Sequence, residues 1–477
     1  MKHYNILVTV VLAVASLFTA CDDYVDIKPT GRETVDSASV YLDLIELPGR
    51  CYYPSAFAML TDNCWVLESN VLGHEDTSWD GINATFNTSA SRTQLSDNNL
   101  YENAYTYILR SNIILSEVDN SQGTDSIKQI AKAEAKILRA WDHFVVVNTF
   151  AKAYNPATAA TDGGVPIVNY YNLEATPKKS SVEEVYSFII KDIDEALPYL
   201  QVTPKTVYHP SQAFGYALKA LVHLFHHDWS TAADAARKSL ELNSELADYV
   251  KLNAAGGPTK DSEYGQGNNP EVLNYAAQGS LTENPAYAYG MISPELVKEF
   301  SSDDLRFKLF FKTTGSKYQL DAGSGAALWN TSVTYKKFFY STVGLRTAEV
   351  YLILAECQAR QGDNNGAMTT LNKLRAKRYL DFNASNYTAS NTKEMMQQVL
   401  SERRKELLFG FHRFWDLKRL SVEPGYAKTI VRTFPVVSAE VEHKTYTLEP
   451  DSRLYVIPFP QSAREKNANL TLNTDEE

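Results

Sequence analysis

Residues 211–240 read SQAFGYALKALVHLFHHDWSTAADAARKSL, and this stretch decides the fold. Ser211 begins an apolar pattern with the 3.6-residue spacing of a helix, and the pattern ends near His226. Residues 227–229 form a short turn, after which alanines recur through residues 232–236. Small residues at regular spacing let two antiparallel helices approach closely, as in tetratricopeptide repeats. The stretch therefore predicts a helix hairpin.

The same helical spacing recurs along most of the chain. It predicts helices over residues 98–118, 127–150, 181–200, 347–361, 366–377 and 393–419. Ser181 is a predicted N-cap with Glu184 as its capping-box partner, and Gly362 is a predicted C-cap. Helix pairs of this kind bury their faces only against neighbouring pairs. We therefore expect a mainly α, tetratricopeptide-like superhelix with long irregular loops and a few short strands.

Two segments interrupt the helical pattern. Residues 243–345 contain Gly-, Pro- and Asn-rich stretches and short β-like runs such as residues 333–335, and residues 70–97 are also irregular. Long irregular segments within a helical scaffold are typical of functional loops. We expect these two to carry the function.

Composition excludes one class of function. The chain has 477 residues, of which 44% are hydrophobic and 12% aromatic, and its formal net charge is −11. These values are ordinary for a globular protein. The acidic balance argues against a nucleic-acid-binding protein, because that function needs basic patches.

The N-terminus has the form of a secretory signal. Lys2 precedes a short apolar run over residues 6–15, and small residues follow before Cys21. Thr19-Ala20-Cys21 resembles a bacterial lipobox, in which Cys21 would be lipidated and become the mature N-terminus. The alternative is a plain cleaved signal with an incidental cysteine.

The other cysteines indicate no metal or redox motif. Cys51 and Cys64 could pair in an oxidising envelope, although the sequence does not decide this. Cys357 lies in a helical pattern and is expected to be a small buried residue. The chain contains no Cys-x-x-Cys pair, which excludes a zinc ribbon or a thioredoxin-like site.

Several blocks, in order and over nearly the whole chain, resemble the SusD/RagB family of outer-membrane nutrient-binding lipoproteins. They are CDDYVDIKP (21–29), AEAKILRA (133–140), GVPI (164–167), SVEEVY (181–186), RTAEVYLILAE (346–356), ERRKEL (402–407), HRFWDLKR (412–419), LYVIP (454–458) and NANL (467–470). One departure is Gly410-Phe411, where the family usually has Glu-Gly.

The resemblance implies a function. Members of this family are helical proteins that sit as lids on TonB-dependent, SusC-like transporters, bind oligosaccharides or sometimes peptides, and lack catalytic activity. We therefore expect a lipid-anchored, surface-exposed outer-membrane protein that binds a glycan and needs no cofactor. Alternatives are a surface glycoside hydrolase, a peptide-binding member of the same family and a scaffold that binds only protein. The expected divisions are a signal peptide (1–20), an N-terminal helical region (21–242), a loop-rich insert (243–345) and a C-terminal region (346–477).

The charged and metal-ligating residues favour structural roles. His74-Glu75-Asp76 and His226-His227-Asp228 lack the i, i+4 histidine spacing of a helical zinc site. No Gly-x-Ser-x-Gly elbow or P-loop is present. Charges recur at helical spacing over residues 402–419, and we interpret them as an ion-pair network that ties the last helices together.

The candidate ligand site comes from the aromatic residues. Trp141, Trp229 and Trp415 lie in helical patterns and are expected in the core, whereas Trp79 and Trp329 lie in the irregular segments. Exposed aromatic rings beside carboxylates and amides suit sugars. We expect residues 70–97 and 285–337 to meet as a shallow platform.

On this platform two kinds of side chain have distinct roles. Trp79, Trp329 and Tyr287 or Tyr289 would stack on ligand rings, and Glu75, Asp76, Asp80 and Asn83 would hold hydroxyls. The alternative is that these aromatic rings pack back onto the scaffold.

Overall fold

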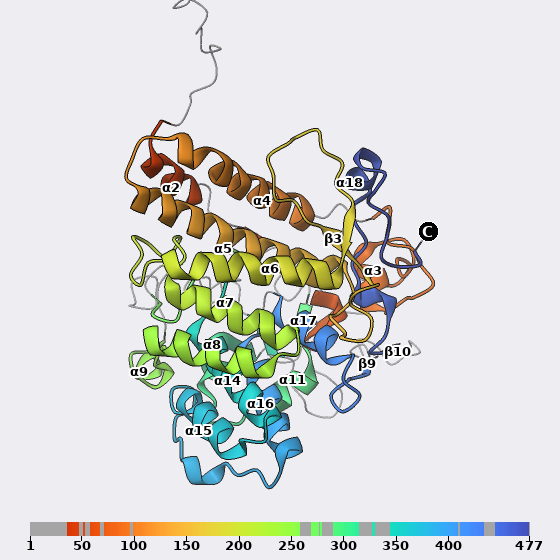
Figure 1. Cartoon of the computed structure of the whole chain (residues 1–477). Helices are drawn as coiled ribbons and strands as arrows, with labels where there is room; N and C mark the ends of the chain where they lie inside the picture. The colour runs from red at the N-terminus through yellow and green to blue at the C-terminus, as the bar shows by residue number, and fades with distance from the viewer. Residues whose placement is uncertain are drawn as a thin grey trace, which may run out of the picture.

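Figure 1 shows a mainly helical molecule, known from a computed structural model of the chain. The structure describes residues 36–46, 51–52, 58–66, 71–95, 99–257, 269–275, 277–278, 290–313, 327–329, 344–408, 411–433 and 444–476. The signal peptide and Cys21 lie outside these residues. Among the described helices, none is long and apolar enough to cross a membrane.

Long antiparallel helices stack one beside the next to form the scaffold (Figure 1). In chain order they are α4 (Asn99–Glu117), α5 (Asp125–Phe150), α6 (Val182–Ala196), α7 (Gln212–Phe225), α8 (Trp229–Leu242), α14 (Thr347–Arg360), α15 (Asn364–Arg375) and α16 (Thr392–Glu406). Each packs on its predecessor, and α14 packs on both α7 and α8 across the intervening loop-rich segment. The predicted mainly α superhelix is confirmed.

Local signals in the sequence explain where these helices begin and turn. Ser181 and Glu184 form the predicted capping box at the start of α6, and the Ser211 side chain caps α7. His227 adopts a left-handed conformation with φ 62° in the turn before α8. Gly362 has φ 84° after α14, a conformation that glycine adopts without steric cost. The capping residues and the hairpin over residues 211–240 are therefore as predicted.

The last long helix differs from its prediction. Residues 393–419 do not form one helix, because α16 ends at Glu406 and α17 (His412–Leu420) begins after a break. Leu407 and Leu408, which follow α16, pack into two different clusters of buried apolar residues. The end of α16 therefore coincides with a division of the following apolar side chains between two clusters, which the spacing of residues 393–419 does not show.

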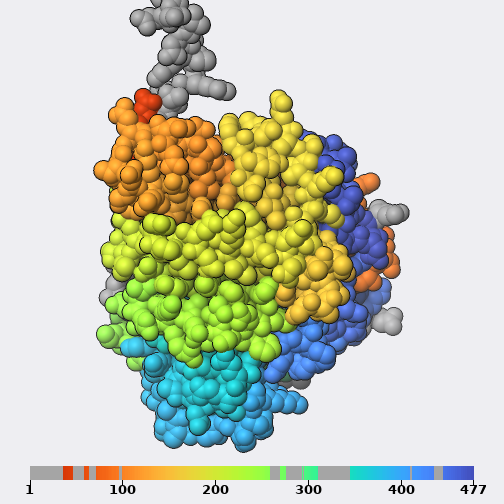
Figure 2. All heavy atoms as spheres, viewed as in Figure 1, coloured from red at the N-terminus to blue at the C-terminus, as the bar shows by residue number. Residues whose placement is uncertain are grey.

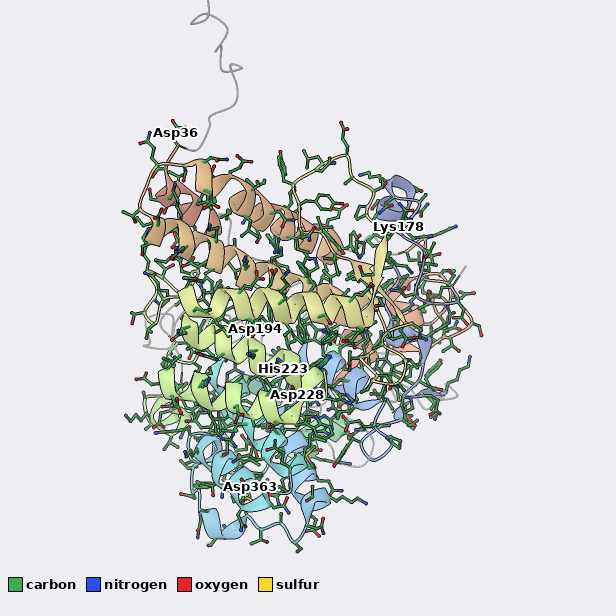
Figure 3. All side chains as sticks on the ribbon, in the orientation of Figure 1. Asp36, Lys178, Asp194, His223, Asp228 and Asp363 are labelled. Carbon is green, nitrogen blue, oxygen red and sulfur yellow. The ribbon has the colours of Figure 1, made fainter. Side chains whose placement is uncertain are left out.

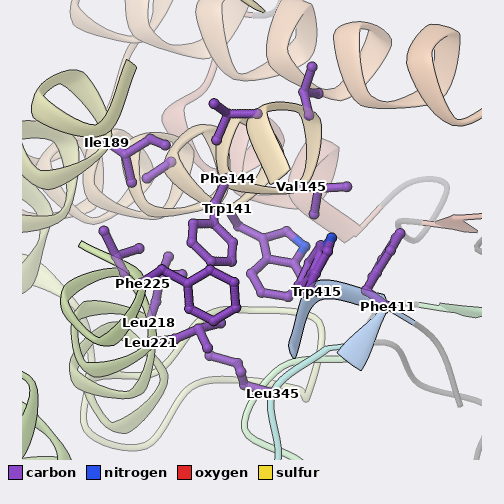
Figure 4. Packing of buried hydrophobic residues seen from close by; sticks show 14 of the residues in the cluster. Trp141, Phe144, Val145, Ile189, Leu218, Leu221, Phe225, Leu345, Phe411 and Trp415 are labelled. Carbon is purple, nitrogen blue, oxygen red and sulfur yellow. The ribbon is translucent and has the colours of Figure 1, made fainter. Parts of the chain in front are cut away.

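The main core lies where α5, α7 and α17 meet (Figure 4). Trp141 and Trp415 are almost completely buried, and their ring centroids are 6.4 Å apart. Phe411 stacks on Trp415 at 4.6 Å with an interplanar angle of 7°. Trp229 is only partly buried at the edge of this core. Cys357 is fully buried, as predicted.

Short elements complete the described fold. Among the described residues the strands pair two by two: β1 (Cys51–Tyr52) with β5 (Ala277–Gln278), β2 (Cys64–Val66) with β6 (Gly290–Ile292), β3 (Gly163–Pro166) with β4 (Lys179–Ser181), β7 (Phe311–Thr313) with β8 (Ala327–Trp329), and β9 (Ile430–Thr433) with β10 (Thr445–Leu448). The short helices are α2 (Ala38–Glu46), α3 (Trp79–Ala84), α9 (Tyr249–Ala254), α11 (Pro294–Glu299), α12 (Leu305–Phe310) and α18 (Gln461–Lys466). The β1–β5 pair is parallel and the others are antiparallel.

The charged residues of α16 and α17 form the predicted ion-pair network, but it is buried and reaches further than these two helices. Arg378 pairs with Glu406 of α16 at 2.8 Å and with Glu271 at 2.5 Å, and all three are fully buried or nearly so. Arg403 of α16 likewise pairs with Glu349 of α14 and Asp416 of α17. The network therefore joins the loop-rich segment to the C-terminal helices.

Candidate ligand-binding surface

The segment from Val71 to Leu95 carries the described part of the predicted site. The sequence predicted an irregular stretch, but the segment contains a short helix, α3, which Trp79 begins. Ser78 precedes this helix with extended backbone, and its side chain accepts a hydrogen bond from the Gly81 N–H at 3.0 Å. Trp79 and Asp80 therefore occupy the first turn of a capped helix.

The His74 carbonyl organises the loop before α3. It accepts hydrogen bonds from the backbone N–H of Thr77 and of Ser78 and from the Ser78 hydroxyl. The same carbonyl lies so close to Gly81 that a Cβ on residue 81 would overlap it. Only glycine fits this approach, so residues 74–80 form a closed loop held against α3.

Arginine contacts between this segment and the C-terminal region fix the segment from behind. Arg92 is fully buried and pairs with Glu476, and its guanidinium also donates to the carbonyl oxygens of Leu454 and Val456 at 3.0 and 2.8 Å. Arg453 donates to the Ala90 carbonyl at 2.8 Å. The Arg432 guanidinium donates to the Ala84 carbonyl at 2.7 Å. These bonds give the exposed loop a rigid base, although the partners are more than 300 residues apart in sequence.

The front of the loop is polar and open to solvent. Asp76 and Asp80 are exposed, and Glu75 is partly exposed. Trp79 is partly buried: it packs against the main core, and its ring centroid lies 5.6 Å from the Arg92 guanidinium carbon. The surface thus combines two exposed carboxylates with one aromatic side chain that a rigid base supports.

Asn83 differs from its expected role. The sequence analysis placed it among the groups that hold ligand hydroxyls, but it is fully buried in α3. Its side-chain oxygen lies 3.5 Å from Arg92 Nη1. Because Asn83 faces inward on a helix whose first turn is exposed, it does not belong to the candidate surface.

The other half of the predicted platform is described only in part. Tyr287 and Tyr289 lie outside the described residues, and Trp329 ends strand β8 but its side chain is not among those described. Strand β6 pairs with β2, and the Ser293 hydroxyl donates to the Asp62 carbonyl at 2.5 Å. The described contacts therefore place residues 290–293 against residues 62–66, which directly precede the first segment of the platform.

Hollows that the sequence did not indicate lie elsewhere on the described surface. One, of about 550 Å³, is lined by the connection after α5, the end of α17 and residues 450–456 and 473–475. The other, of about 450 Å³, lies between α16 and the residues after α15. Lys418 borders the first hollow, and its ammonium donates to the Asn148 carbonyl at 2.8 Å near the end of α5. Burial lowers the pKa of Lys418 well below its usual range.

Histidines near the α7–α8 turn lie close to carboxylates. His223 lies 3.3 Å from Asp228 and His226 lies 3.6 Å from Glu183, in the α7–α8 region seen in Figure 3. Within the described ranges, no group of three or more histidine, cysteine or acidic side chains is arranged to hold a metal ion.

Comparison with known protein families identifies the chain. Residues 329–475 match the family model described as "SusD family". Residues 53–224 match a second model, described as "Starch-binding associating with outer membrane". The chain belongs to the SusD/RagB family. The resemblance seen in the sequence is thereby confirmed, and the second description associates the family with the outer membrane.

Individual relatives agree with this assignment. SusD-like proteins P2 and P25 of Formosa agariphila are each 22% identical to this chain, over 421 and 443 residues, which cover 78% and 80% of it and 78% of each relative.

Solved structures match the fold. SusD superfamily proteins from Bacteroides vulgatus and Bacteroides thetaiotaomicron align with TM-scores of 0.71 and 0.70, each over 92% of this chain and 99% of theirs. A SusD-like carbohydrate binding protein from Bacteroides vulgatus aligns over 91% of this chain and 97% of its own, with a TM-score of 0.64. All three are 19% identical to this chain, so they establish the fold alone.

Proposed function

We propose that this protein binds a glycan at the outer-membrane surface and delivers it to a TonB-dependent, SusC-like transporter, without chemical conversion of the ligand. The observation that carries the proposal is the match of residues 53–224 to a starch-binding family model. These residues include the exposed loop 74–80 and helix α3.

The loop offers groups suited to a sugar. Carboxylates such as Asp76 and Asp80 accept hydrogen bonds from pairs of sugar hydroxyls, and an indole supports the apolar face of a sugar ring. In this proposal Trp79 stacks on the ligand, and Trp329 with Tyr287 or Tyr289 completes the platform from the second segment. Glu75, Asp76 and Asp80 hold hydroxyl groups. A rigid base favours binding, because little conformational entropy is lost when the ligand arrives.

One experiment separates binding from catalysis. The purified protein is titrated calorimetrically with a panel of oligosaccharides, and each mixture is then incubated and analysed by chromatography for shorter products. We expect heat of binding with at least one glycan and recovery of that glycan intact. Cleavage products would favour a surface hydrolase instead, and binding of peptides but not glycans would favour a peptide-binding member of the family.

Substitution of Trp79 tests the position of the site. A stacked aromatic ring contributes about 0.5–1.5 kcal/mol beyond its buried area, so Trp79→Ala should weaken glycan binding roughly two- to tenfold. Trp79→Ala combined with Trp329→Ala should nearly abolish it. Trp229→Ala is the matched control, because Trp229 is also partly buried but lies at the α7–α8 turn, where Arg360 stacks on it at 5.0 Å. The control should lower the melting temperature and leave affinity unchanged.

The proposed site is wrong if the double variant keeps wild-type affinity. It is also wrong if Trp79→Ala collapses the thermal transition, since Trp79 would then act as a packing residue.

A further inference from the structure

The connection between β3 and β4 carries an unusual concentration of exposed apolar side chains. Tyr170, Tyr171 and Leu173 have 41%, 50% and 72% of their surface exposed. Leu173 is the most exposed large hydrophobic residue in the part of the chain that the structure describes. Single exposed apolar residues are common on proteins, but three within four positions mark an interaction surface.

The base of this connection is held firmly. The Asn112 amide of α4 donates to the carbonyl oxygens of Val168 and Tyr170 at 3.0 and 3.1 Å. On the returning side, the Asn469 amide donates to the Thr176 carbonyl at 2.8 Å and the Asn467 amide donates to the Pro177 carbonyl at 2.9 Å. The apolar tip therefore projects from a fixed frame.

The tip and the start of the described chain lie at the same end of the molecule. Asp36 is labelled at that end in Figure 3, and Figures 1 and 2 show the connection in yellow at the same end, beside α4. Helix α2, which follows Asp36, is joined to the α4–α5 connection by a hydrogen bond from the Ala38 N–H to the Gln122 carbonyl at 2.8 Å. The α4–α5 pair therefore contacts both the base of the apolar connection and the start of the described chain.

The lipid anchor proposed at Cys21 would act at this end. Cys21 precedes Asp36 by 15 positions. A chain of that length spans at most about 50 Å. A short tether gives the tip a high effective concentration at the surface to which Cys21 is attached, so weak contacts suffice.

We propose that Tyr170, Tyr171 and Leu173 form a second, reversible membrane contact that orients the lipid-anchored protein on the outer membrane. This inference rests on the anchor in the proposed function. Tyrosine rings favour the boundary between water and acyl chains, and leucine favours the acyl region. Three side chains are too few for a protein interface, which typically buries about 800 Å² per partner, whereas a lipid surface accepts an isolated apolar tip.

A fluorescent probe at the tip tests the proposal. Leu173→Cys is labelled with an environment-sensitive dye, and the lipidated full-length protein is reconstituted into phosphatidylglycerol–phosphatidylethanolamine vesicles. We expect the dye emission to shift to the blue on plain vesicles. We expect its fluorescence to be quenched when the vesicles contain lipids with a nitroxide on the acyl chain. The matched control is Ala384→Cys, an exposed position between α15 and α16, which lie at the opposite end in Figure 1. The control dye should show neither change.

A second experiment tests the membrane contact without the lipid at Cys21. The chain from Asp22 onward, with an N-terminal hexahistidine tag, is held on vesicles that contain a nickel-chelating lipid, and the same signal is expected. If the lipidated form fails to join vesicles while the tagged form shows quenching, the anchor is wrong and the membrane contact stands. Vesicle-bound protein without quenching at residue 173 overturns the contact. Protection of the dye only when a β-barrel partner is present also overturns it, because the tip would then bind protein.

Discussion

At the scale of single residues, the close approach of the His74 carbonyl to Gly81 holds loop 74–80 against α3. The sequence indicates Trp79 and Asp80 as exposed neighbours, and both lie in the first turn of α3. It does not indicate that the His74 carbonyl closes onto Gly81, because that contact depends on the shape of the loop. Nor does it place Asn83 on the inner face, since a helix of six residues is too short for its apolar pattern to be recognised.

Gly81→Ala should therefore disturb the site more than the scaffold. A Cβ at this position overlaps the His74 carbonyl, so the loop must move away from α3. We expect a loss of about 1–3 kcal/mol in the free energy of unfolding, as for other forced overpacking, together with weaker glycan binding. Gly425→Ala is the control, because Gly425 is exposed and a Cβ there meets nothing within 4 Å. Equal stability and equal glycan affinity in the two variants, measured by urea unfolding and calorimetry, would contradict this account of the loop.

His143 makes the stability of the fold depend on pH. It is fully buried in α5, and burial lowers its pKa to about 3. Its Nδ1–H donates to the Arg139 carbonyl at 2.9 Å, and Nε2 accepts from the Val168 N–H at 3.3 Å. The two bonds together require the neutral ring, because a proton on Nε2 would point at the Val168 N–H.

Acid pH destabilises the folded state through His143. Between pH 6.5 and about 3 the unfolded histidine binds a proton that the folded one does not, so stability falls as pH decreases through this range. The slope from one such group approaches about 1.4 kcal/mol per pH unit. His143→Gln should be less stable at pH 7 but should lose less stability between pH 6.5 and 4.5, as measured by urea unfolding at each pH. An unchanged slope would show that other groups cause the acid sensitivity.

At the scale of elements, helix starts and turns were predictable and one helix break was not. Capping side chains act within three or four residues, so Ser181, Ser211 and Gly362 could be recognised from the sequence. The break after α16 lies beside Leu407 and Leu408, which pack into two separate clusters of buried apolar residues. The ion pairs of α16 and α17 were predicted, but their burial was not, because a partner such as Arg306, which pairs with Glu402 of α16, comes from the distant loop-rich segment.

The burial of this network gives it a large effect on stability. Burial opposes the charge on Glu406, but Arg378, Arg346 and Arg306 overcome this and lower its pKa to about 2. Glu406→Gln removes the carboxylate that these three buried arginines share, and it should lower the free energy of unfolding by about 3–5 kcal/mol. The wild type should lose this contribution as pH falls from 4.5 to about 2, because protonation of Glu406 then mimics the substitution.

A surface ion pair is the control for this substitution. Glu195 accepts from Lys136 at 2.6 Å, and its side chain is 43% exposed. Glu195→Gln should change the free energy of unfolding by less than about 1 kcal/mol. Chemical denaturation of both variants at pH 7 measures the difference. Similar values for the two would mean that the buried network contributes to specificity of the fold but little to its stability.

At the scale of the whole molecule, side chains within residues 404–476 hold N-terminal segments in place, and we call this set of contacts the C-terminal clamp. Arg453 and Glu476 contact Ala90 and Arg92 in the segment that carries Trp79, and Asn469 fixes the base of the exposed apolar connection. Arg404 and Arg413 bind Asp62, which lies just before β2. Contacts between residues so far apart in sequence leave no local pattern, which is why the mainly α architecture could be predicted but the assembly of the site could not.

The clamp also keeps the proposed glycan site apart from the end of the molecule that would face the membrane. The described chain starts beside α4, whereas loop 74–80 lies against the C-terminal segments (Figure 1). If Cys21 is the lipidated mature N-terminus, the tether reaches the molecule at the α2 end. The membrane attachment would then leave the loop free for a glycan.

Cys21→Ala tests this arrangement. Each buried methylene of an acyl chain contributes about 0.8 kcal/mol, so several chains on one cysteine hold a protein firmly, and their loss should release it. The variant should move from the outer-membrane fraction to the soluble fraction after a carbonate wash, which strips proteins held only by peripheral contacts such as the Tyr170–Leu173 tip. Cys357→Ala is the control, since Cys357 is fully buried in α14 and should not affect fractionation. A Cys21→Ala protein that stays in the washed membrane would show that another part of the chain provides the anchor.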